Sequence, residues 1–174
     1  MAKVESRRAV TTTTTTTVPV PATQERPADE IGLRCQAAID AALASLVASG
    51  QAPADADGVC RTREQDSFLG NRTGYSIGVR FVVRYPFDTV PESQWDQTWH
   101  DVAVHEIGHT WSRRLDAAQQ QSYATIRGQA GWNPEDYADA FAAVVGGATW
   151  IGYIGSPPPP EQVDQLCAEG LLPC

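Results

Sequence analysis

Apolar residues recur at three- and four-residue steps between Asp29 and Ser49. The repeating positions are Ile31, Cys35, Ala38, Ile39, Ala42 and Leu46. This spacing places them on one face of an α-helix, the face that packs against a core. Gly50 follows directly and is typical of a helix end. The pattern therefore predicts an amphipathic helix whose role is packing.

A different period governs residues 75–85, where apolar and polar side chains alternate. Tyr75, Ile77, Val79, Phe81, Val83 and Tyr85 share one face of an extended chain, and Ser76, Arg80 and Arg84 share the other. This period of two predicts one half-buried strand, which Pro86 ends. A candidate strand at Val59–Phe68 and the turn formers of residues 69–74 precede it, and this order suggests a hairpin.

Two further patterns predict helices. Thr89-Val90-Pro91-Glu92 has the form of a capping box, so a helix is expected from about Val90 to Leu115. Asn133 is a good N-cap and Pro134 suits the first helical position, so another helix opens there. Residues 161–169 form a short terminal helix. These elements predict an α+β fold with a short antiparallel or mixed sheet.

Residues 1–27 show no periodic apolar face. They contain a run of threonines from Thr11 to Thr17, followed by Val18-Pro19-Val20-Pro21. Such a segment buries too little surface to offset the entropy of ordering it. We therefore predict a disordered or extended tail over residues 1–27 and a folded domain over residues 28–174. Thr/Pro tracts are typical of stalks at cell surfaces.

Charge and hydropathy narrow the classes of partner. The chain of 174 residues has a formal net charge of −8 and a pI near 4.7, which argues against a nucleic-acid partner. No apolar run is expected to span a bilayer. Residues 1–10 are polar and basic and lack the apolar stretch of a signal peptide. Two expectations follow, a cytoplasmic protein or one whose export segment lies upstream.

The four cysteines fit no metal-binding spacing of the C-x-x-C type. Among the three possible pairings, Cys35 with Cys60 and Cys167 with Cys174 close the shortest loops. Four buried free thiols are the alternative. Disulfides would indicate an oxidising compartment, so with the Thr/Pro tail they favour an extracellular or cell-surface location.

The strongest chemical pattern is His105-Glu106-Ile107-Gly108-His109, inside the predicted helix. Residues four apart share a helix face, so His105 and His109 can bind one zinc ion, and Glu106 can reach a water held beside it. Gly108 costs about 1 kcal/mol in a helix interior, which indicates that a neighbouring element needs the space. Two solvated histidines on a surface helix are the alternative.

A tetrahedral zinc site needs a third protein ligand, and no histidine follows His109. The best candidate is Glu135, in the first turn of the next predicted helix. Asp139 lies four residues later on the same face, where it can hold the N–H of a ligating histidine. Asp139 and Asp136 remain alternatives as ligand, although capping explains Asp136 without a metal.

The motif resembles the HExxH zincin metallopeptidases. Glu135, Ala138, Asp139, Phe141 and Ala142 are similar to the second ligand helix of gluzincins, namely thermolysin-type and ImmA/IrrE-type proteins, with Asp139 in place of an asparagine of the latter. The resemblance implies a small zincin-like domain with Zn2+ bound by His105, His109 and Glu135. It also implies that Glu106 is the general base and that Asp139 supports a ligand.

The resemblance further implies a zinc metallopeptidase that acts on a peptide or protein substrate. Tyr123 is expected to stabilise the oxyanion, with Tyr137 and His100 as lesser candidates. The segment Gly78–Tyr85 is expected to be the edge strand that pairs with substrate. A catalytically inactive zincin-fold module for binding or sensing is the alternative function.

Overall fold

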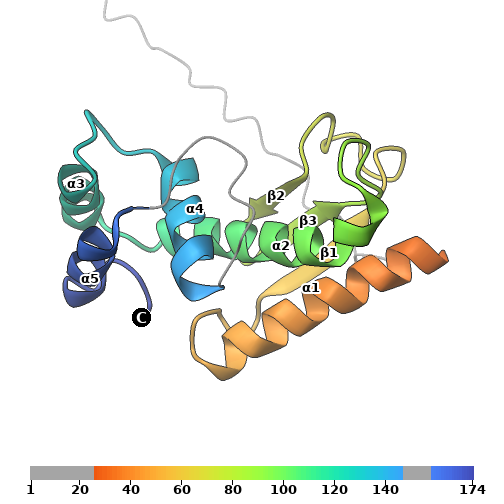
Figure 1. Cartoon of the computed structure of the whole chain (residues 1–174), viewed down its shortest axis with the longest axis horizontal. Helices are drawn as coiled ribbons and strands as arrows, with labels where there is room; N and C mark the ends of the chain where they lie inside the picture. The colour runs from red at the N-terminus through yellow and green to blue at the C-terminus, as the bar shows by residue number, and fades with distance from the viewer. Residues whose placement is uncertain (1–25, 147–157) are drawn as a thin grey trace, which may run out of the picture.

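The computed structural model describes residues 26–146 and 158–174. They contain five α-helices, one short 3-10 helix and a three-stranded sheet, which confirms the predicted α+β class (Figure 1). The predicted tail over residues 1–27 lies almost wholly outside the described residues.

Helix α1 (Glu30–Ala48) matches the predicted amphipathic helix. The Asp29 side chain caps it by accepting a hydrogen bond from the Gly32 N–H at 2.8 Å. By length and composition alone α1 could cross a membrane, with a mean hydropathy of 1.4, contrary to the expectation that no segment could. Core helices pass the same test, and α1 buries Cys35, Ile39 and Leu46 in the core.

The sheet has the order β1-β3-β2 and consists of β1 (Asp57–Arg61), β2 (Gly74–Ile77) and β3 (Arg80–Arg84). β1 is parallel to β3, and β2 is antiparallel to it. The prediction of one strand over residues 75–85 is therefore wrong. Gly78 has a φ of 63° and turns the chain back between β2 and β3, because glycine adopts this conformation without steric cost.

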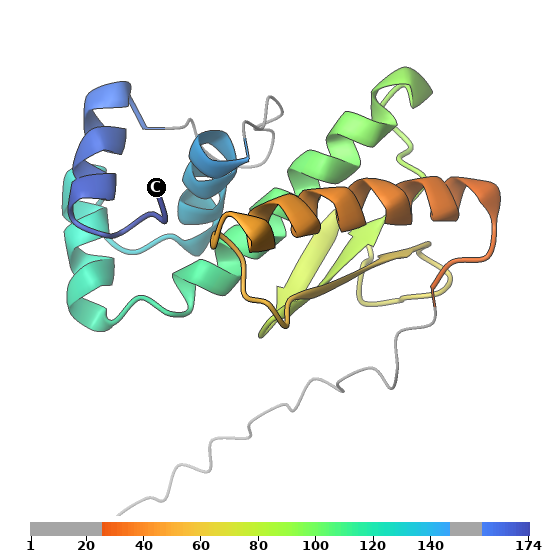
Figure 2. The same cartoon turned by 90° about the horizontal axis from the view of Figure 1, so that it is seen from below.

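The same turn corrects the predicted edge of the sheet. β3, expected to lie at the edge, is the central strand, and β2 is the edge strand. One face of the sheet carries Phe81 and Val83 into the main core, where α1 and α2 cover it (Figures 1 and 2). On the other face Val59 and Val82 pack with Leu69 of the loop between β1 and β2.

Helix α2 (Trp95–Ser112) crosses the middle of the molecule and is preceded by the 3-10 helix η1 (Glu92–Gln94). The predicted capping box at Thr89–Glu92 is not observed, since Pro91 is the N-cap residue of η1 and no side chain caps it. The α-helix thus starts about five residues later than predicted, at Trp95, whose indole N–H donates to the Val90 carbonyl at 2.9 Å.

Three helices complete the fold: α3 (Ala117–Ile126), α4 (Pro134–Val145) and α5 (Pro160–Ala168). α4 packs across α2, while α3 and α5 lie side by side at one end of the molecule (Figures 1 and 2). Both predicted disulfides are present, Cys35–Cys60 and Cys167–Cys174. They account for all four cysteines and exclude the free-thiol alternative.

Candidate metal centre

Helix α2 presents the two histidines of the motif side by side. Its apolar residues are buried, Val104 fully and Ile107 to 1% exposure, so its position in the core is fixed. The imidazole centroids of His105 and His109 are 4.8 Å apart with the rings nearly perpendicular, and each side chain is only 12% exposed. The four-residue spacing thus places both rings on one face, as predicted.

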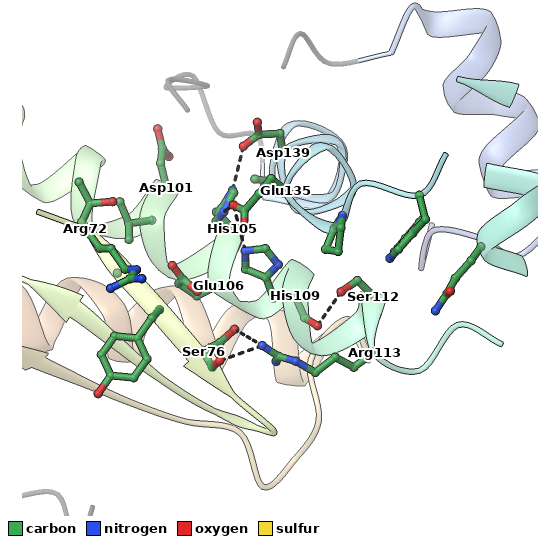
Figure 3. Close-up of a pocket in the computed structure, with 18 residues that line it drawn as sticks. Arg72, Ser76, Asp101, His105, Glu106, His109, Ser112, Arg113, Glu135 and Asp139 are labelled. Carbon is green, nitrogen blue, oxygen red and sulfur yellow. Dashed lines mark hydrogen bonds and ion pairs between the residues drawn. The ribbon is translucent and has the colours of Figure 1, made fainter. Parts of the chain in front are cut away.

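Helix α4 brings Glu135 to these imidazoles. The Asn133 side chain accepts a hydrogen bond from the Glu135 N–H at 3.1 Å, and Pro134 is the first helical residue. The helix start is therefore well defined, and Glu135 lies in its first turn. Its Oε2 is 3.4 Å from His105 Nε2 and 3.3 Å from His109 Nε2 (Figure 3).

These distances fit a tetrahedral cation. Zinc bonds of about 2.0–2.2 Å at tetrahedral angles separate neighbouring ligand atoms by about 3.4 Å. The ligand atoms of His105, His109 and Glu135 all lie within 4.8 Å of one another. Two imidazole nitrogens and one carboxylate oxygen are also a donor set that zinc prefers. The three residues could therefore hold a metal ion.

Asp139 lies behind His105, one turn after Glu135. Its Oδ1 is 2.8 Å from His105 Nδ1, and its side chain is 5% exposed. A hydrogen bond at Nδ1 leaves Nε2 facing Glu135 and fixes the orientation of the ring. Asp136 points elsewhere, toward Gln129 and Arg127. Of the three acids considered as ligand, the structure brings Glu135 to both imidazoles.

Gly108 permits the close approach of the two ligand helices. A Cβ atom at this position would lie 2.8 Å from the Cα of Ala138 and 3.1 Å from its carbonyl oxygen. Both atoms belong to the backbone, so no rotamer change could relieve the contact. This confirms the interpretation that a neighbouring element needs the space at Gly108.

The charges of the site stabilise one another. Burial lowers the pKa of His105, but its hydrogen bonds with Asp139 and Glu135 and the nearby carboxylates outweigh burial and raise the pKa to about 9. Hydrogen bonds from His105 and His109 hold the pKa of Glu135 well below its usual range. Positive charge is therefore favoured between these carboxylates, which is also the requirement for binding a cation.

Glu106 lies beside the imidazoles on the same helix and is 5% exposed (Figure 3). Burial raises the pKa of its carboxyl group, although His105 and His109 partly offset this. Its Oε2 is buried and has no hydrogen-bond partner within the described part of the chain. A buried carboxylate oxygen without a partner, next to side chains that could hold a metal ion, is suited to accept a hydrogen bond from a water molecule.

A cavity of about 520 Å³ opens over this group. Strand β2 forms one wall, and α4 with the segment before it forms another. Arg72 and Asp101 lie toward one end, and Ser112 and Arg113 toward the other (Figure 3). The candidate ligands lie between these ends, so an extended molecule in the cavity would pass over them.

The three further candidates from the sequence do not line this cavity. Tyr123 is fully buried, and its hydroxyl donates to the Asp136 carbonyl at 3.1 Å. Tyr137 is also buried and donates to the Leu171 carbonyl at 2.6 Å. His100 contacts the Asp101 carboxylate. Tyr123 is thus placed in the aromatic packing with Trp132 and Tyr137 rather than where an oxyanion would form.

Three residues near the site were missed by the sequence analysis: Gly74, Ser76 and Arg113. A Cβ at Gly74 would lie 2.8 Å from Glu106 Oε1 and 2.9 Å from the Val82 carbonyl oxygen, so glycine lets β2 pack closely against both. A lone glycine at the start of a strand is a recognised sign of such close approach. Arg113 lies one helical turn after His109, a spacing that places it on the same helix face.

No protein-family model, no curated protein and no solved structure matches this chain. The similarity to zincins therefore consists of the motif and of the group of side chains that the fold assembles around it.

Proposed function

We propose that this protein is a zinc-dependent metallopeptidase. The observation that supports the proposal most is the convergence of His105, His109 and Glu135 from two helices at separations that suit one tetrahedral ion. The buried carboxylate of Glu106 beside this group supplies the base that hydrolysis requires. Asp139 holds the imidazole of His105 in the orientation that leaves Nε2 for the metal.

The substrate is an extended peptide that lies along β2. This strand is at the edge of the sheet and lines the cavity beside the metal centre. Edge strands bind peptides by forming main-chain hydrogen bonds, and the cavity supplies space for alternate side chains. A peptide bound in this way would pass over Glu106 and the metal ligands.

Zinc, when bound, polarises the scissile carbonyl and acidifies a water molecule held beside it. Glu106 removes a proton from this water while the water oxygen bonds to the carbonyl carbon. Glu106 then donates the same proton to the leaving nitrogen as the C–N bond breaks. Its raised pKa favours this double duty, because a carboxylate of ordinary acidity returns a proton less readily.

Two disulfides indicate a non-cytoplasmic environment. We propose an extracellular or cell-surface location for the protein, where a peptidase meets peptides and exposed protein segments.

The decisive experiment replaces the base while leaving the metal ligands intact. Purified protein is tested for zinc content by elemental analysis and for cleavage of a broad peptide library by mass spectrometry. We expect Glu106→Gln to retain one zinc per chain and to lose cleavage by at least about a hundredfold, since general-base catalysis contributes about 10²–10⁴-fold. Glu92→Gln is the control, because Glu92 is an exposed carboxylate that pairs with Arg34.

Two other outcomes would reject the proposal. A zinc-loaded parent protein that cleaves no peptide in the library would indicate the inactive binding or sensing module. Absence of stoichiometric zinc from the parent protein would leave no hydrolytic centre to consider.

A further inference from the structure

The outer edge of β2 offers few backbone groups for pairing. In an antiparallel pair, residues alternate between those that bond to the neighbouring strand and those that face away from it. The Arg84 N–H donates to the Thr73 carbonyl at 2.7 Å, so Thr73 bonds inward and the next residue, Gly74, faces outward. By the same alternation Tyr75 bonds inward and Ser76 faces outward. A bound peptide could therefore use only the N–H and C=O of Gly74 and Ser76.

Arg113 already binds one of these four groups, the Ser76 carbonyl. Its Nη2 donates to the Ser76 carbonyl at 2.8 Å and to the Ser76 hydroxyl at 2.9 Å (Figure 3). Its Nη1 donates to the Gly78 carbonyl at 3.2 Å, which also accepts from the Thr110 hydroxyl at 3.1 Å. These bonds place the guanidinium against the outer edge of β2 at Ser76, where the N–H of a paired chain would have to approach the same carbonyl past the Arg113 donors.

We propose that Arg113 sets the position of the bound peptide by ending the stretch of β2 with which it can pair. The inference rests on the proposed function and adds a specificity-determining residue to it. Gly74 exchanges two hydrogen bonds with one substrate residue, and the Ser76 N–H donates a third. The fourth bond would run from a substrate N–H to the Ser76 carbonyl. At this place the substrate N–H instead faces the N–H donors of Arg113.

This arrangement has a chemical consequence for the substrate. In antiparallel pairing, the N–H without an acceptor belongs to the residue two positions before the one opposite Gly74. At that position a residue that lacks the N–H, such as proline, loses no hydrogen bond to β2. Opposite Gly74 the same residue would lose one, so proline is disfavoured there. Arg113 therefore favours peptides with proline or another N-substituted residue at that one position and fixes which bond lies over the metal centre.

Backbone N-methylation tests the inference. A cleaved peptide is prepared as a series in which each amide in turn is methylated, and KM is measured with the full chain loaded with zinc. In the parent protein we expect methylation of the amide opposite Gly74 to raise KM. Methylation of the amide two residues before it in the peptide should leave KM unchanged. In Arg113→Met the second position becomes sensitive as well, by about two- to tenfold, the effect of one hydrogen bond.

Arg114→Met is the matched control. Arg114 has the same charge, lies next to Arg113 and stacks on Trp111 without lining the cavity. We expect it to give the parent pattern. Arg113→Gln, whose side chain is shorter and uncharged, replaces Arg113→Met if the latter no longer binds zinc or no longer has the circular dichroism spectrum of the folded parent.

The outcomes separate this inference from the proposed function. Cleavage with the same methylation pattern in the parent, Arg113→Met and Arg113→Gln would overturn the role of Arg113 and leave the peptidase intact. Failure of the zinc-loaded parent protein to cleave any peptide, so that no methylation series can be prepared, would overturn both. A new sensitive position two residues away, seen only when Arg113 is replaced, would support the role of Arg113.

Discussion

Helices α2 and α4 both contribute to the candidate metal centre, but they hold their side chains differently. The histidines of α2 are each 12% exposed, on a helix packed against α1, the sheet and α4. The Glu135 side chain of α4 is 43% exposed and lies in the first turn of its helix. The imidazole pair is therefore preorganised by the core, whereas the carboxylate depends on how α4 is placed. Metal affinity should respond more sharply to changes in α2.

The largest expected effect comes from removing one imidazole. His109→Ala leaves two ligands from different helices, so we expect the protein to lose stoichiometric zinc, measured by elemental analysis after dialysis. Glu135→Ala should weaken zinc binding without abolishing it, because a water molecule can take the place of the exposed carboxylate. His100→Ala, outside the cavity, should keep one zinc per chain. Equal losses of zinc in His109→Ala and Glu135→Ala would contradict the conclusion that the site depends more on α2 than on α4.

The pH dependence of metal binding should be the next largest effect. The pKa of His105 is raised from 6.5 to about 9, so near pH 7 metal binding must release a proton from this imidazole. Zinc affinity should therefore fall about tenfold per pH unit from about pH 9 down to about pH 7, as measured by competition with a chelator of known pH dependence.

The folding stability of the metal-free protein should show the opposite trend and fall as the pH rises. A raised pKa stabilises the folded state fully below the unfolded value of 6.5, and this contribution is lost as pH rises through about 9. Denaturant titration of chelated protein would measure it. For the first of these two predictions, a zinc affinity that stays level between about pH 7 and pH 9 would show that Asp139 and Glu135 do not hold a proton on His105.

Asp139→Asn tests the support that α4 gives to α2. The substitution keeps the size of the side chain but removes the charge beside His105 Nδ1, and such changes cost about 10–100-fold in metal affinity. Asp136→Asn, on the same helix but directed toward Gln129 and Arg127, should bind zinc as the parent does. Matching affinities in the two variants would argue against a role for Asp139.

The smallest expected effect concerns the contact between the two helices. Gly108→Ala would place a Cβ 2.8 Å from the Ala138 Cα, so the helices must move apart. We expect a loss of about 1–3 kcal/mol in the free energy of unfolding, with weaker zinc binding. Gly131→Ala meets nothing within 4 Å and is the control for the loss of glycine. If Gly108→Ala has the stability and zinc affinity of the parent, the separation of the two helices is not critical.

The sequence predicted those parts of the centre that depend on local spacing. His105 and His109 follow from a four-residue helical repeat, and Glu135 from the capping signals of Asn133 and Pro134. Both disulfides follow from loop length, because nearby cysteines close the shortest loops. In each case the residues that interact, or the signals that place them, are close together in the chain.

The rest depends on contacts between distant segments. The two-residue turn places Tyr75 opposite Val82 and Ile77 opposite Arg80, so the face to which odd-numbered residues point changes at Gly78. The sequence conceals this change because the residues of β3 after Arg80 are buried on both faces. Glycine at position 74 makes room for Glu106, and the role proposed for Arg113 depends on its contact with Ser76, more than thirty residues away in each case. Helix α3 was not predicted, although Asp116 and Gln119 form a capping box.

The two disulfides each close a loop within one part of the protein. Cys35–Cys60 joins α1 to β1, and Cys167–Cys174 joins α5 to the segment after it. Neither links the helix that bears the histidines to the helix that bears Glu135. A metal ion shared by His105, His109 and Glu135 would thus be a cross-link that the covalent structure lacks. Chelation should then lower the melting temperature even where every disulfide stays intact.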